Sequence, residues 1–116
     1  MNKRLLIFTF FAFITIAATA GFFMTSLQVT VMDEKGNLQE NARVLLYDNK
    51  EDFLNEENPV QDPAFTNQKG KVLIKKLDPQ PYYIAITKDE MDNFGASDYV
   101  DTLKEGRMNK VNVIIY

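Results

Sequence analysis

The side chains of this chain that could do chemistry are carboxylates, because its 116 residues include no His and no Cys. Without His, both the usual general base near neutral pH and the commonest metal ligand are missing. Serine occurs only at Ser26 and Ser97, and a serine nucleophile needs an activating base. The residue inventory therefore predicts a protein that is not an enzyme and carries no cofactor.

Calcium binding is the one metal chemistry that the acids suggest. Segment 89–101 is rich in carboxylates, and we identify Asp89, Asp92 and Asp98 as the candidate ligands. Ca²⁺ takes six to eight oxygen ligands, although the segment lacks the spacing of an EF-hand. A solvated acidic loop explains the same residues, so both interpretations stay open.

Aromatic side chains are the second set of candidates, and the chain contains no Trp. Phe53 and Phe94 lie in polar segments, where a ring either contacts a partner or packs back to anchor its loop. Tyr82 and Tyr83 are adjacent in an expected strand and must point to opposite faces. We select Phe53, Tyr82 and Phe94 as interaction candidates, for a protein partner or, alternatively, for a carbohydrate.

Charge argues against nucleic acid as a partner. The formal net charge is −3, but Lys3 and Arg4 precede a hydrophobic run and all 16 acids follow it. Without residues 1–20 the chain keeps 11 basic and 16 acidic groups, a net charge of −5. An acidic surface of this kind repels phosphates and anionic lipid headgroups.

The N-terminal segment predicts export. A short positive region precedes the apolar run 5–18, and Ala18-Thr19-Ala20 fits the small-x-small pattern of a signal-peptidase site. We predict a signal peptide over 1–20; the alternative is an uncleaved membrane anchor over 5–24. Both place residues 27–116 outside the cytoplasm: periplasmic, extracellular at a bacterial cell surface, or tethered to the inner membrane.

The rest of the chain reads as short strands separated by turn signals. The pattern predicts an all-β, roughly seven-stranded Greek-key sandwich, preceded by the hydrophobic N-terminal helix. Segments 64–66 and 71–77 are expected to pair as a hairpin, and 48–63 to be a long surface loop with one short helical turn. The expected strands are 27–33, 42–47, 64–66, 71–77, 82–88, 99–103 and 109–116.

Two motifs carry a family resemblance. Thr66-Asn-Gln-Lys-Gly70 is followed by a strand and then by Leu77-x-Pro79-x-x-Tyr82. With Gly36 and Ala42 upstream, this arrangement resembles the carboxypeptidase regulatory-like domain, a transthyretin-like (prealbumin-like) β-sandwich grouped with starch-binding-like and Cna-B-type domains. The resemblance covers roughly 27–87 and the terminal strand.

The resemblance implies a non-catalytic accessory or surface module. It also implies that the motif residues determine the fold rather than form a site; these are Gly36, Ala42, Thr66, Gly70, Leu77 and Tyr83. We therefore expect an exported interaction or structural module with a protein partner in the cell envelope, and a small carbohydrate- or calcium-binding module as the alternative. An apolar patch formed by segments 48–65 and 89–98 is the expected sign of a protein partner.

Overall fold

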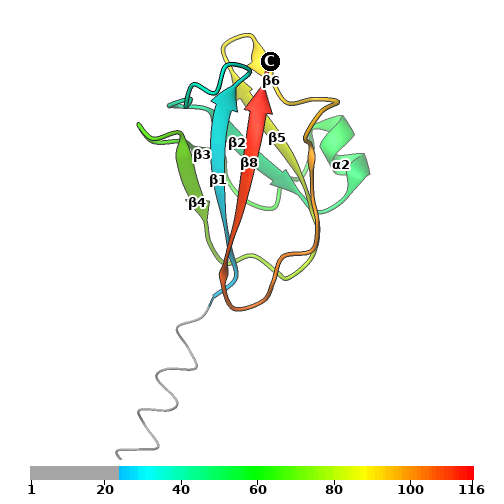
Figure 1. Cartoon of the computed structure of the whole chain (residues 1–116). Helices are drawn as coiled ribbons and strands as arrows, with labels where there is room; N and C mark the ends of the chain where they lie inside the picture. The colour runs from blue at the N-terminus through cyan, green and yellow to red at the C-terminus, as the bar shows by residue number, and fades with distance from the viewer. Residues whose placement is uncertain (1–23) are drawn as a thin grey trace, which may run out of the picture.

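Two β-sheets pack face to face in the computed structural model, which describes residues 24–116 (Figure 1). Its eight strands and one short helix confirm the all-β sandwich. The smaller sheet has the order β4-β1-β8 and contains β1 (Ser26–Asp33), β4 (Lys71–Ile74) and β8 (Met108–Ile115). The larger sheet contains β2 (Arg43–Tyr47), β3 (Ala64–Phe65), β5 (Tyr82–Lys88), β6 (Met91–Asp92) and β7 (Tyr99–Val100).

The predicted signal peptide 1–20, like the alternative anchor 5–24, lies outside the described residues apart from Met24. Within 24–116, the structure contains no helix with the length and apolar character needed to cross a membrane.

Strand alternation places the core between the sheets. On β1 the side chains of Leu27, Val29 and Val31 are fully buried, as the period-two pattern predicts. β8 lies parallel to β1 and contributes Val113 and Ile115 to the same core. The strand nearest the N-terminus and the strand at the C-terminus thus form the centre and one edge of the smaller sheet.

The expected hairpin between segments 64–66 and 71–77 is wrong. β3 pairs with β2 in the larger sheet, whereas β4 pairs with β1 in the smaller one. The turn between them crosses from sheet to sheet. The cause is the buried Thr66 hydroxyl, which accepts from Ala42 N at 2.9 Å and donates to Gln39 O at 2.5 Å. These bonds hold β3 beside the start of β2.

Gly70 is at the other end of this crossing, and its backbone leaves no room for a side chain. Its φ is +71°, and a Cβ built on it would lie 2.8 Å from Val31 O and 3.1 Å from Gln39 N. The Gly70 carbonyl accepts from Val31 N at 2.8 Å, which draws the start of β4 against β1. Only glycine satisfies both the left-handed φ and this close approach.

We expect Gly70→Ala to lower the free energy of unfolding by about 3 kcal/mol, because the cost of a left-handed φ for alanine and the cost of the backbone clash add together. Gly95→Ala is the matched control, since Gly95 has φ +79° and nothing within 4 Å of its Cβ position. The control should cost only about 1 kcal/mol. Urea unfolding of both variants measures the difference, and equal losses would contradict the close-approach argument.

The turn after β1 is organised by the Asp33 carboxylate. Its Oδ1 accepts from Asn37 N at 2.9 Å and Lys35 N at 3.0 Å, and its Oδ2 accepts from Asn37 Nδ2 at 3.1 Å. The backbone hydrogen bond from Asn37 is the main reason that the pKa of Asp33 lies below its ordinary value. Gly36, with φ +84°, supplies the left-handed position in this turn.

This lowered pKa predicts a pH-dependent contribution to stability. Because the folded pKa is below the unfolded value of about 4, the contribution is fully present above that value. It is lost as the pH falls through the folded pKa. We expect wild type to lose stability relative to Asp33→Asn on acidification, measured by urea unfolding from pH 7 to pH 2. A difference between the two proteins that does not change with pH would count against this role.

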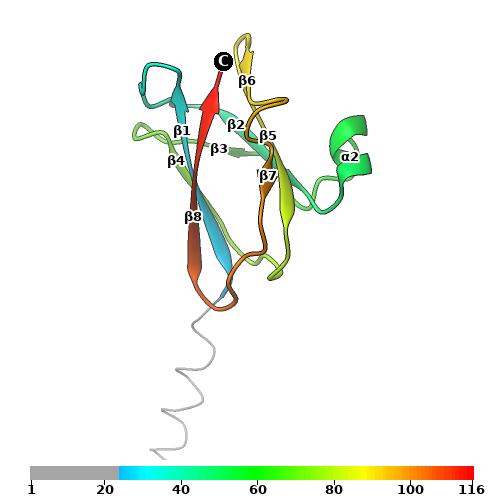
Figure 2. The same cartoon turned by 45° about the vertical axis from the view of Figure 1, so that its right-hand side comes forward.

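The one helix within residues 24–116, α2 (Lys50–Asn55), covers the outer face of the larger sheet. Figure 2 shows it on the side of the sandwich that faces away from β1, β4 and β8. It occurs within the long acidic segment 48–63, where one short helical turn is expected from the sequence. The two outer faces of the sandwich therefore differ: one is an open sheet, and the other carries a helix.

Candidate functional site

Helix α2 is short, and its two ends are defined by capping. Asn49 has extended backbone, and its side chain accepts from Asp52 N at 2.8 Å, which satisfies one of the free N–H groups of the first turn. Glu56 adopts a left-handed conformation with φ 54° and ends the helix. Glu57 N then donates back to Asp52 O at 3.0 Å. These local bonds present one side of α2 to the sheet.

Phe53 is the residue that holds α2 in place. Its ring is 7% exposed and stacks on Tyr83, with ring centroids 5.5 Å apart. The ring of Tyr47 meets it edge-on at 5.9 Å. Leu45 and Ala85 complete this second apolar cluster on the outer face of the larger sheet. Of the two roles open to Phe53 from the sequence, the structure therefore shows the anchor.

Phe94 and Tyr99 extend the aromatic cluster to the surface. The Phe94 ring lies 6.0 Å from that of Phe53 and is 45% exposed. The Tyr99 ring lies 5.2 Å from that of Tyr83 and is 51% exposed. Rings from β2, α2, β5, β7 and the 93–98 loop thus form one continuous cluster, buried at Phe53 and exposed at its margin.

A groove opens between α2 and the 93–98 loop. We call it the α2 groove; its volume is about 310 Å³, and it is lined by Phe53, Leu54, Glu56, Phe94, Gly95 and Asp98. Leu54 is 66% exposed on its rim. The groove therefore joins apolar side chains to two carboxylates. Residues of segments 48–65 and 89–98 thus form an apolar patch, which is the expected sign of a protein partner.

The 93–98 loop is held by Asn93, a residue that is not among the candidates selected from the sequence. Its side chain is fully buried. Its Oδ1 accepts from Ile86 N at 2.8 Å, and its Nδ2 donates to Ile84 O and Ser97 O, both at 2.9 Å. The side-chain amide thus makes the hydrogen bonds to β5 that a neighbouring strand would otherwise make, at the point between β6 and β7. No sequence pattern distinguishes this Asn from those in exposed turns.

Tyr82 does not belong to this surface, which corrects its selection as an interaction candidate. Tyr82 is buried between the sheets, and its hydroxyl donates to Asp78 O and accepts from Asp78 N, both at 3.0 Å. Burial raises the pKa of this phenol. Tyr83, which the resemblance implies is a fold-determining residue, lies on the outer face against Phe53. The strand register reverses the two expected positions.

The carboxylates proposed for calcium do not converge. Across residues 24–116, no group of three acidic side chains is placed to hold a metal ion. The Asp92 carboxylate instead accepts from Phe94 N at 3.0 Å, and the Asp92 backbone pairs with Tyr116. Asp89 has a left-handed φ of 54° in the turn between β5 and β6. Asp98 is the one candidate that lies at the α2 groove.

A sugar platform requires two exposed, nearly parallel rings. Of the ring pairs in the cluster, Phe53 and Tyr83 are close to parallel, at 28°, but Phe53 is buried. The exposed rings of Phe94 and Tyr99 each meet their neighbour at a steep angle, 68° and 60°. This geometry gives the carbohydrate hypothesis no direct support.

No family model matches the sequence. No curated protein matches it either. The fold is similar to that of BcpA, the major pilin subunit of Bacillus cereus, with a TM-score of 0.55 and 14% identity. The match covers 79% of this chain and 29% of the pilin subunit, so the chain spans under a third of that protein's length. At this identity the likeness shows the fold alone, a β-sandwich, and it does not show that the chain belongs to the carboxypeptidase regulatory-like family.

Proposed function

We propose that the protein is a non-enzymatic, exported β-sandwich module that binds a protein partner in the bacterial cell envelope through the α2 groove. The observation that carries the proposal is the exposed apolar margin of a buried aromatic cluster. Leu54, Phe94 and Tyr99 are all large and exposed. The rings of Phe94 and Tyr99 pack against those of Phe53 and Tyr83, and hydrogen bonds of the Asn93 side chain hold the 93–98 loop. Exposed aromatic side chains backed by a packed cluster are typical of binding hot spots.

Three further features support this proposal. The N-terminal hydrophobic run and its small-x-small site predict export. The similarity of the fold to that of a pilin subunit is compatible with a structural or accessory role outside the cytoplasm. The motifs that resemble carboxypeptidase regulatory-like domains imply the same class of role. The net acidic charge disfavours nucleic acid as the partner.

Site-specific photo-crosslinking in the exporting host tests the proposal. A photoreactive amino acid replaces Leu54 or Phe94 in the groove; the matched control replaces Phe65, which is also exposed but lies on β3 outside the groove. We expect discrete protein adducts from both groove positions and none from position 65. Adducts of equal yield from all three positions, or from none, would contradict a docking role for the groove.

A further inference from the structure

The outer face of the smaller sheet carries a second feature, located on the edge strand β4. Register with β1 pairs Val72 with Val29 and Ile74 with Leu27, so these side chains point into the core. Lys71 and Leu73 must then point outward. Leu73 is 41% exposed, and Lys75, directly after β4, is also exposed. We call Lys71, Leu73 and Lys75 the basic knob: an apolar side chain between two ammonium groups.

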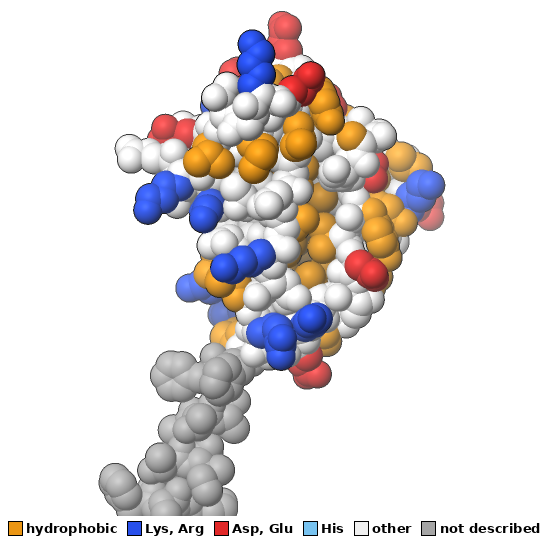
Figure 3. All heavy atoms as spheres, viewed as in Figure 1, with side chains coloured by type: hydrophobic (Ala, Val, Ile, Leu, Met, Phe, Trp, Pro, Cys, Tyr) orange, Lys and Arg blue, Asp and Glu red, His pale blue; other side chains and the backbone are white. Residues whose placement is uncertain are grey.

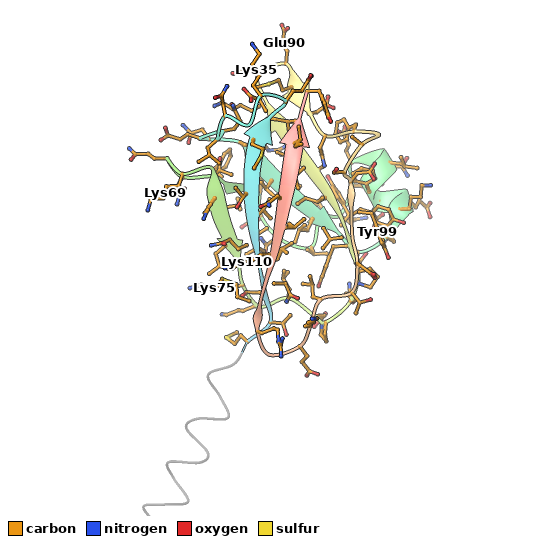
Figure 4. The ribbon with its side chains drawn as sticks, viewed as in Figure 1. Lys35, Lys69, Lys75, Glu90, Tyr99 and Lys110 are labelled. Atoms are coloured by element: carbon orange, nitrogen blue, oxygen red, sulfur yellow. The ribbon has the colours of Figure 1, made fainter. Side chains whose placement is uncertain are left out.

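The sheet around the basic knob is free of negative charge. None of the outward residues of β1, β4 and β8 is acidic, and Lys110 on β8 adds a further cation. In Figure 3, lysine and arginine side chains occupy the left and lower parts of this face. Figure 4 shows Lys75 and Lys110 extending from the same side. One face of the domain is therefore positively charged, although the net charge of the chain is negative.

The α2 groove has the complementary composition. Its apolar lining comes from Phe53, Leu54 and Phe94, and Glu56 and Asp98 also line it. The surrounding segment 48–62 adds further acids and only one Lys. An apolar side chain flanked by two cations is therefore the ligand chemistry that this groove fits, since the apolar contact gives binding energy and the charges give orientation.

We propose that the partner of the α2 groove is a second copy of this chain, which inserts Leu73 of its basic knob while Lys71 and Lys75 approach Glu56 and Asp98. This inference rests on the proposed function and names its partner. The knob and the groove lie on opposite sides of the sandwich, because β4 belongs to the smaller sheet and α2 covers the larger one (Figure 2). A contact between two different patches is heterologous, so it repeats from copy to copy and builds an open chain or, where the rotation closes, a ring.

The lysines of β4 also fit this arrangement in another way. Lysine on an edge strand prevents further strands from pairing at that edge. The basic knob thus blocks edge-to-edge association while leaving its outward face free to contact a neighbour. A contact of this small area is weak, and we expect self-association between about 10 µM and 1 mM.

Sedimentation velocity of the protein, in the form that its host exports, tests the proposal. We expect the sedimentation coefficient to rise with concentration beyond that of a dimer, and to fall when NaCl is raised from about 0.02 M to about 0.5 M. Leu73→Asn removes the apolar side chain of the basic knob, and Leu54→Asn removes the apolar side chain on the rim of the groove. Neither side chain is buried in the core, so both variants should stay folded, with a melting temperature close to that of the wild type. Each should weaken self-association about tenfold or more.

Mixing the two variants is the decisive step. Leu73→Asn keeps an intact groove and Leu54→Asn keeps an intact knob, so an equimolar mixture should form a 1:1 dimer with the wild-type affinity and grow no longer. A wild-type protein that stays monomeric at 1 mM, or variants that associate as wild type does, would overturn the proposal. Association that stops at a symmetric dimer, for instance through the open edge of β8, would overturn it as well.

The crosslinking experiment separates this inference from the proposed function. An adduct from position 54 or 94 with the mass of two copies of the chain supports self-association. An adduct from the same positions with a different protein overturns self-association and leaves the groove as a docking site.

Discussion

Replacing Phe53 by Ala is expected to lower the free energy of unfolding by about 3 kcal/mol, a large part of the stability of so small a domain. The ring is almost fully buried and contacts Tyr47, Tyr83 and Phe94. Its loss removes the contacts that hold α2 to the sheet and leaves a cavity above Leu45. The α2 groove should be lost along with them.

Chemical unfolding measures this effect, and Leu54→Ala is the control. Leu54 is the next residue of the same helix and is mostly exposed, so its truncation should change stability by no more than about 0.5 kcal/mol. Groove-dependent crosslinking at position 94 should fall with Phe53→Ala even where the protein remains folded. A loss below about 1 kcal/mol for Phe53→Ala would show that α2 does not depend on this ring.

Asn93→Ala is expected to cost a similar amount, about 3 kcal/mol, for a different reason. It leaves the Ile86 N–H and the carbonyls of Ile84 and Ser97 without the partner that the side-chain amide supplies. Buried backbone groups that lose their partner carry the full cost of leaving water. Hydrogen exchange should show the 93–98 loop and the centre of β5 opening together in this variant.

Two further variants locate the cause of this loss. Asn93→Asp has almost the same shape, but at neutral pH it cannot donate to Ile84 O or Ser97 O, so it should be destabilised as much as Asn93→Ala. Asn112→Ala removes an exposed amide from β8 and should change stability by less than about 0.5 kcal/mol. If Asn93→Asp kept wild-type stability, the two donated hydrogen bonds would not be what holds the loop.

The strands that form the core could be predicted from the sequence, because alternation of apolar and polar residues is a local property. Segment 27–33 places Leu27, Val29 and Val31 on one face, and the structure buries all three. The terminal strand behaves in the same way at Val113 and Ile115. Turn chemistry is equally local, so the turns at Gly36 and Gly70 fall where the sequence predicts them.

Pairing between strands was not predictable in the same way. The turn at 67–70 looks like a hairpin turn in sequence, yet β3 and β4 join different sheets. The choice depends on Thr66 reaching Gln39 and Ala42, and on Gly70 reaching Val31, all of them distant in the chain. Likewise, alternation shows that Tyr82 and Tyr83 face opposite ways but not which of them faces the core.

By itself, the sequence determined the class of the protein: an all-β domain without the residues for common catalysis, with an export signal predicted before it. Tertiary structure decided the site. Phe53 and Phe94 both lie in polar segments, and only packing against Tyr83 makes one an anchor and leaves the other exposed. Basic and acidic residues are spread along the sequence. They form a positive sheet face and a negative groove only because the fold places them on opposite sides of the sandwich. Local residue patterns report local geometry, whereas a binding surface is made by contacts between distant segments.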